Sequence, residues 1–104
     1  MLYRLRFAEA ALSDIDAVSD YFDDRAGEAV AASFARALDR DLRLIRERPL
    51  AFAFFHETGP PYRAKLVRLG QSTYWLVYLV QEDRGVIDVL RFWSSLREPG
   101  THGL

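Results

Sequence analysis

The C-terminal part of the sequence most constrains the fold, because it reads as three short strands in succession. Residues 62–69, 73–80 and 86–93 are rich in β-branched and aromatic side chains. Gly70-Gln71-Ser72 and residues 82–85 separate them, and both segments are typical of turns. We expect these strands to form a small antiparallel sheet to which the upstream residues supply a covering layer.

The upstream residues predict one more strand and a helical hairpin. Residues 2–7 alternate in polarity with the period of a strand. Apolar side chains then recur at helical spacing over residues 8–25 and again over residues 28–48, with a break at Gly27. Pro49 ends the second helix. Two amphipathic helices joined by a tight turn form an αα-hairpin.

This order predicts an α+β fold, β-α-α-β-β-β, with the helix hairpin packed on one face of the antiparallel sheet. Half of the 104 residues are apolar, enough for one core, and we expect residues 1–104 to form a single domain. Because such a sheet has only one covered face, the opposite face should be covered by a partner or left to water and to function.

Composition narrows the classes of function. The chain has no cysteine, which excludes disulfides and thiolate chemistry, and no apolar run approaches the about 18 residues that span a bilayer. We therefore expect a cytoplasmic protein with no membrane association. The net charge of −1 argues against a general nucleic-acid binder. The carboxylates of the first helix are interpreted as a solvated face and His56 as a loop residue; we expect no metal and no cofactor.

Two groups of side chains remain as candidates for a site. The first group is the set of cations in and after the last three strands: Arg63, Lys65, Arg68, Arg91 and Arg97. Beside tyrosine and tryptophan side chains, these cations could hold phosphates, bind an acidic protein surface, or form the solvent-exposed face of the sheet. Alternation places Arg63 and Lys65 on one face, together with one or more of the others. The aromatic residues Phe52, Phe54 and Phe55 either pin the connection before the sheet to the core or expose a patch for a partner.

The whole chain resembles the RelE/ParE superfamily of bacterial toxins, the toxic halves of type II toxin–antitoxin pairs. The resemblance is carried by ordered segments along the chain: residues 3–7, 9–12 and 14–15, 20–21 with Gly27, 32–34, 44–49, 68–69 with 74–78, and 89–93, and finally Arg97-Glu98-Pro99. It implies the RelE/ParE-like fold and a protein of the plasmid-stabilisation class. It also implies a cognate antitoxin and a toxin–antitoxin hetero-oligomer.

The superfamily divides by target. RelE-like members are ribosome-dependent, metal-independent endoribonucleases that use lysines and arginines at the scissile phosphate of messenger RNA. Arg63, Lys65 and Arg97 match positions of that catalytic set. Trp75, however, replaces the third-strand arginine, Ser94 stands where a histidine is common, and no tyrosine follows Arg97.

This departure favours the ParE branch, whose members are inhibitors of DNA gyrase and not enzymes. On that resemblance the target contacts are Trp93 and Arg97, with Arg91 and Arg68, and the antitoxin contacts are Phe52, Phe54 and Phe55. A RelE-like ribonuclease acting on the ribosome and its messenger RNA is the alternative. An inactive relative that only binds an antitoxin is the third possibility.

Overall fold

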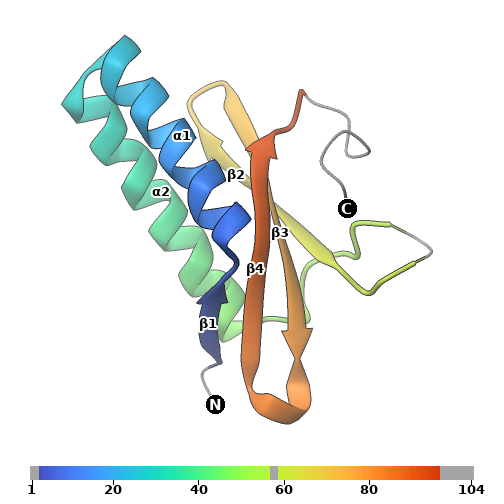
Figure 1. Ribbon diagram of the computed structural model, residues 1–104. Coiled ribbons are helices and arrows are strands. Elements are labelled where there is room, and N and C mark those ends of the chain that lie inside the picture. Colours follow the sequence, from blue (N-terminus) through green and yellow to red (C-terminus); the bar gives the residue numbers. More distant parts are fainter. Residues whose placement is uncertain (1–2, 57–58, 97–104) are drawn as a thin grey trace.

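The computed structural model describes residues 3–56 and 59–96. Its elements follow the predicted order and lie within two residues of the predicted ranges (Figure 1): β1 Arg4–Phe7, α1 Glu9–Ala26, α2 Glu28–Glu47, β2 Arg63–Leu69, β3 Ser72–Gln81, the short 3₁₀ turn η1 Glu82–Arg84, and β4 Val86–Ser94. The β-α-α-β-β-β order of an α+β fold is therefore confirmed.

The helical hairpin turns at Gly27, as the sequence predicts. Gly27 has φ of 90°, a backbone conformation that favours glycine. Its N–H donates to the carbonyl of Asp23 at 3.2 Å, and its carbonyl accepts from the N–H of Ala31 at 3.2 Å, so one residue closes α1 and opens α2. In the part of the chain that the structure describes, no helix is long and apolar enough to cross a membrane.

The sheet is mixed, which corrects the expectation of a purely antiparallel sheet. Its strand order is β1-β4-β3-β2. The three consecutive strands β2, β3 and β4 pair antiparallel as predicted, whereas β1 pairs with β4 in parallel, Leu5 lying opposite Ile87. Alternation within residues 2–7 reveals a strand but carries no information about the direction of its neighbour, because both kinds of pairing have the same period.

A bulge in β4 changes which residues face the helices. In the register with β3, Tyr78 lies opposite Val89 and Val77 lies opposite Arg91, so Leu90 is the extra residue. Simple alternation would place Trp93 on the same face as Val89. The bulge instead turns Phe92 toward the helices and Trp93 toward the opposite face.

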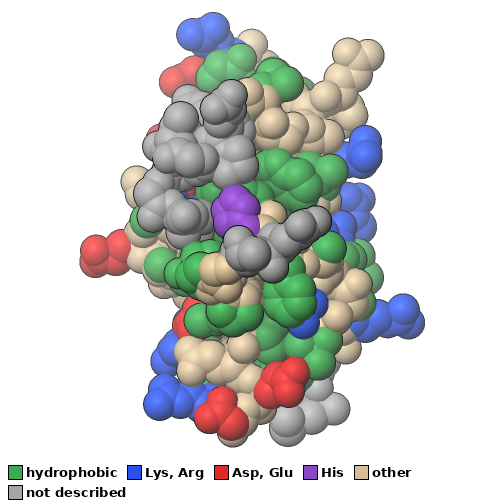
Figure 2. All heavy atoms as spheres, turned by 90° about the vertical axis from the view of Figure 1, so that its right-hand side faces the viewer, with side chains coloured by type: hydrophobic (Ala, Val, Ile, Leu, Met, Phe, Trp, Pro, Cys, Tyr) green, Lys and Arg blue, Asp and Glu red, His purple; other side chains and the backbone are tan. Residues whose placement is uncertain are grey.

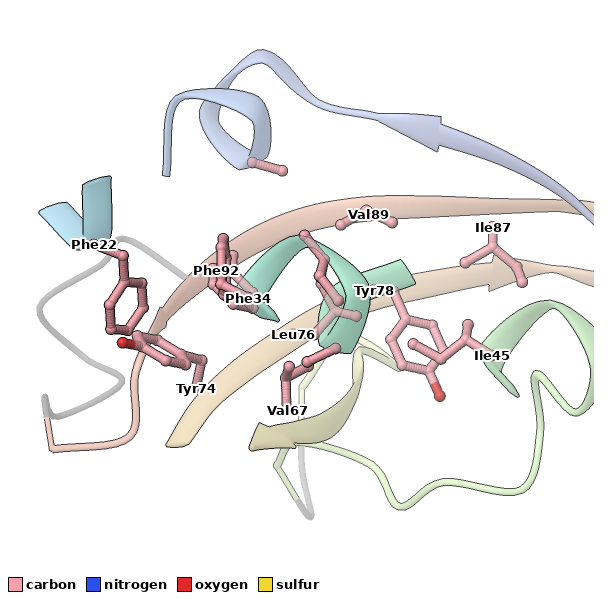
Figure 3. Packing of buried hydrophobic residues seen from close by; sticks show 13 residues of the cluster. Phe22, Phe34, Ile45, Val67, Tyr74, Leu76, Tyr78, Ile87, Val89 and Phe92 are labelled. Carbon is pink, nitrogen blue, oxygen red and sulfur yellow. The ribbon is translucent and has the colours of Figure 1, made fainter. Parts of the chain in front are cut away.

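The main core lies between the hairpin and the sheet (Figure 3). Phe34 of α2 packs its ring against Tyr74 at 6.1 Å and against Phe92 at 5.8 Å between ring centroids. Farther along the sheet, Ile45 and Tyr78 are fully buried in the same cluster. The apolar stripe predicted for the second helix is thus the surface that α2 buries.

The opposite face of the sheet is partly covered by the chain itself, which the sequence did not lead us to expect. Ala64, Val77 and Trp93 are buried there, with Phe55 and Trp75 packed against them. Phe55 belongs to the connection between α2 and β2, which runs on the side of the sheet away from the helices (Figure 1). This second, smaller apolar cluster, which we call the outer cluster, leaves only part of that face for a partner.

Candidate functional site

The two paired cations of β2, Arg63 and Lys65, point to the helix side of the sheet. They alternate with Ala64, which belongs to the outer cluster, and share their face with Val67, which is buried in the main core. Arg68 falls on the outer face, opposite Thr73. The expected common face therefore holds for Arg63 and Lys65, but Arg68 does not join them.

Arg63 is engaged by the connection that precedes its own strand. Its Nη1 donates to the carbonyl of Phe52 at 2.7 Å and to that of Leu50 at 3.4 Å. Its guanidinium lies 4.1 Å from the centroid of the Phe54 ring. Phe54 and Arg63 also form an antiparallel bridge, so the connection runs beside the outer edge of β2. Arg63 thus fixes the backbone that carries the phenylalanines.

Lys65 forms an ion pair with Asp41 of α2. Its Nζ lies 3.0 Å from Oδ1 of Asp41, a residue that is only 2% exposed, and it also donates to the carbonyl of Leu66 at 3.2 Å. The ring of Phe52 lies 5.3 Å from the same Nζ. Asp41 was not identified from the sequence. Its signal was nevertheless present, because Asp41 occupies a position of the apolar stripe formed by Phe34, Leu38 and Ile45.

Arg91 lies against α1. Its Nε and Nη2 donate to the carboxylate of Asp14 at 2.8 and 3.1 Å, and the backbone N–H of Phe92 donates to the same carboxylate at 2.9 Å. The hydrogen bond and the charge of Asp14 raise the pKa of Arg91 above its ordinary value. β1 ends at Phe7, which pairs with Val89, so it does not reach the end of β4. Beyond that point Asp14 supplies the hydrogen-bond acceptor for the backbone N–H of Phe92.

Among the described residues, Arg68 is the cation of the predicted set that is exposed and has no ion-pair partner. Arg97 lies outside the described residues, so its role remains a prediction. Trp93 is 3% exposed, which does not fit a direct surface contact: the Phe55 ring lies edge-on to it, 5.7 Å away between centroids. The predicted target contacts that the structure describes, Arg68, Arg91 and Trp93, therefore do not form one exposed patch.

The three phenylalanines divide between three environments. Phe52 packs against the main core and Phe55 against the outer cluster, where its centroid lies 6.0 Å from Trp75. Phe54 is 53% exposed. Both sequence interpretations are partly met, because two of the rings pin the connection to the protein while one reaches solvent. Figure 2 shows apolar side chains at the surface on the side of the sheet that faces away from the helices.

A hollow of about 470 Å³ lies between α1 and the end of β4. The ion pair of Asp14 and Arg91 lines it together with Tyr74, and the exposed side chains of Tyr21 and Leu96 also contribute. The described residues contain no group of three histidine or carboxylate side chains that could hold a metal ion.

Comparison with solved structures shows which known proteins share this fold. A chain of the chromosomal ParDE toxin–antitoxin system from P. aeruginosa aligns with a TM-score of 0.67 at 15% identity, covering 89% of this chain and 96% of that one. A chain of the intact E. coli RelBE toxin–antitoxin complex aligns with a TM-score of 0.61 at 25% identity, covering 91% and 99%. The isolated E. coli RelE toxin gives 0.61 at 24% identity, covering 97% and 93%.

These alignments define the class: the protein has the fold of the RelE/ParE superfamily of toxins. A comparison with curated proteins gave no significant match. Residues 5–99 match the family described as the ParE toxin of the type II toxin–antitoxin system parDE. The chain therefore belongs to the ParE toxin family and is a type II toxin.

Proposed function

We propose that this toxin inhibits DNA gyrase and is neutralised by a cognate antitoxin with which it forms a hetero-oligomer. The match to the ParE family over residues 5–99 supports the proposal. The observation that carries it is the placement of Arg63 and Lys65, the basic pair that a RelE-like cleavage site would use. Both cations face the helix side and already have partners within the chain.

Metal-independent RNA cleavage requires cations that can approach the scissile phosphate and stabilise the charge that develops on it. Lys65 would have to leave a buried carboxylate 3.0 Å away, and Arg63 would have to leave the backbone of the preceding connection. Trp75 supplies an aromatic ring, packed against Phe55, at the third-strand position where RelE-like toxins carry an arginine. These features favour inhibition by binding over catalysis.

The antitoxin half of the proposal rests on the relatives and on the surface. Structural relatives were solved as a ParDE toxin–antitoxin system and as an intact RelBE complex. Of the phenylalanines first considered as antitoxin contacts, Phe54 offers the largest exposed ring, at 53%. An exposed aromatic side chain held in place by Arg63 is a suitable anchor for a partner, because little conformational entropy is lost when it is buried.

The alternative target is the ribosome. E. coli RelE has the same fold at about one quarter identity, and Arg68 is an exposed cation on the sheet. A ribonuclease would need Arg68 and Arg97 to supply the phosphate contacts that Arg63 and Lys65 do not make in this structure. The exposed position of Arg68 makes this function the second candidate, and one experiment tests both candidates.

The experiment is a pulse of expression without antitoxin, with labelled precursors following DNA synthesis and protein synthesis separately. We expect DNA synthesis to fail first and a DNA-damage response to follow. Purified toxin should inhibit supercoiling by purified gyrase and accumulate cleaved DNA, and the antitoxin should reverse both effects. If protein synthesis fails first and messenger RNA is cut at the ribosomal A site, gyrase is not the target. If neither synthesis fails, the chain is an inactive relative.

The same assay examines the C-terminal cation. From the family resemblance we expect Arg97→Ala to abolish toxicity without unfolding the protein. Arg43→Ala is the matched control, because it makes the same substitution at a side chain that is 72% exposed on α2, in the helix layer of the fold. A fully toxic Arg97→Ala variant, with Arg43→Ala also toxic, would remove Arg97 from the target site.

A further inference from the structure

Asp41 is an unusual residue for the surface it occupies. It lies on the stripe of α2 that packs against the sheet and is 2% exposed, between the buried side chains Leu38 and Ile45. Within the part of the chain that the structure describes, Oδ2 of Asp41 has no hydrogen-bond partner, and Nη2 of Arg40 lies 3.6 Å away. Lys65 is therefore the main compensation for a buried negative charge.

A buried carboxylate is tolerated only when an opposite charge or good hydrogen bonds accompany it. If Lys65 left to bind a phosphate or another acidic group, the buried carboxylate of Asp41 would lose its 3.0 Å partner and keep only the longer contact with Arg40 at 3.6 Å. A ligand that captured Lys65 would have to offset that cost. The pair therefore opposes the use of Lys65 in any outside contact.

Neighbouring hydrogen bonds and ring contacts also hold the connection between α2 and β2 against the sheet. Arg63 donates to carbonyls of that connection, and the hydroxyl of Tyr78 donates to the carbonyl of Pro49 at 3.4 Å. Phe52 lies beneath the ammonium of Lys65. All of these interactions join α2, or the chain that follows it, to the inner side of β2 and β3.

We propose that Asp41, Lys65 and Arg63 form a structural latch that fixes α2 and the following connection on the sheet. The paired basic positions of β2 then do not contact the toxin's target. This assignment extends the proposed function by removing two cations from the target site. It does not require that the target be gyrase.

A double-mutant cycle tests the latch. Lys65→Met leaves Asp41 buried without its partner, and we expect the melting temperature of the refolded full-length chain to fall by more than about 10 °C. The double variant Lys65→Met/Asp41→Leu replaces the pair by apolar side chains of similar size and should recover most of that loss. Arg68→Met is the control for stability, because it removes an exposed cation from the outer face of the same strand; its melting temperature should change by less than about 3 °C.

Toxicity gives the readout that separates structure from target contact. The double variant should arrest growth within about twofold of the wild type, because the fold is restored although the ammonium group is absent. A double variant that regains its melting temperature but has lost toxicity would show that Lys65 touches the target, and the proposal would fall. An unchanged melting temperature in Lys65→Met would overturn it equally.

A second neutral pair keeps the test decisive if the apolar pair packs badly. Lys65→Gln/Asp41→Asn can retain a hydrogen bond between α2 and β2 without either charge. If neither neutral pair restores the melting temperature, mutual charge compensation is not what the two residues provide, and the latch is rejected. The precursor-labelling experiment on the wild type identifies the target separately, so a failure of the gyrase proposal does not change what the melting temperatures say about the latch.

Discussion

Replacing Asp14 by alanine should lower the free energy of unfolding by about 2.5 kcal/mol, because one carboxylate serves three N–H donors. The Asp14 and Arg91 side chains are 18% and 24% exposed, so water screens the pair only in part. We assign about 1.5 kcal/mol to the Phe92 N–H bond and about 1.5 kcal/mol to the Arg91 pair, the low end for hydrogen bonds to charged groups. The better helix propensity of alanine returns about 0.5 kcal/mol.

The measurement is urea unfolding of the refolded chain, followed by tryptophan fluorescence. With a denaturant slope of about 2 kcal/mol per molar, the midpoint should fall by about 1.2 M. Asp16→Ala is the matched control: it makes the same substitution two residues away on the exposed face of α1 and has the same gain in helix propensity. Its midpoint should stay within about 0.3 M of the wild type, since exposed substitutions away from such contacts usually have small effects.

A double-mutant cycle with Arg91→Met separates the two parts of this interaction. The coupling energy between Asp14 and Arg91 should be about 1.5 kcal/mol, and the remaining loss in Asp14→Ala should persist when Arg91 is already replaced. If Asp14→Ala and Asp16→Ala unfold at the same urea concentration, the carboxylate does not stabilise the open edge of β4, and the reasoning is refuted.

Two further predictions concern the buried rings. Burial raises the pKa of Tyr78 to about 12, from about 10 in an unfolded chain, while the charge of Arg63 acts in the opposite direction. The unfolded state therefore loses its proton first, so the stability that Tyr78 provides is complete below pH 10 and falls as the pH rises to 12. Tyr78→Phe should remove up to about 3 kcal/mol of that decline, and equal slopes in the two proteins would contradict the burial argument. Phe55→Ala should lower the free energy of unfolding by about 2 kcal/mol and shift the tryptophan emission to the red, because Phe55 covers Trp75 and Trp93. Phe54→Ala is the control and should lower it by less than about 1 kcal/mol, because Phe54 is 53% exposed. If Phe54→Ala is the more destabilising of the two, the outer cluster is not packed.

The helical hairpin could be predicted from the sequence because its signals are local. The apolar side chains of α2 recur at helical spacing over residues 30–45, and Gly27 supplies the one backbone conformation that the turn requires. The direction of β1 could not be predicted in this way. It depends on a pairing with β4 from the far end of the chain, and neither strand's own pattern records it.

The orientation of β2 shows a different limit. The strand carries apolar residues on both faces, with Ala64 and Leu66 on one face and Val67 and Leu69 on the other. Alternation therefore predicts that Arg63 and Lys65 share a face but not which face it is. Asp41 determines which face this is, because a carboxylate on the buried stripe of α2 needs a cation on the strand that packs against it. The bulge at Leu90 similarly moves Trp93 to the outer face, and no turn residue in the sequence marks it.

These placements give three of the predicted cations a role within the protein itself. Arg63, Lys65 and Arg91 are turned toward the protein, where each meets a carbonyl or a carboxylate. An enzyme that stabilises a phosphate needs its cations free before the substrate arrives, because reorganisation during the reaction weakens their effect. A binding inhibitor needs instead a rigid surface, and the ion pairs that join α1 and α2 to the sheet supply that rigidity. This arrangement supports our proposal of inhibition by binding rather than by RNA cleavage.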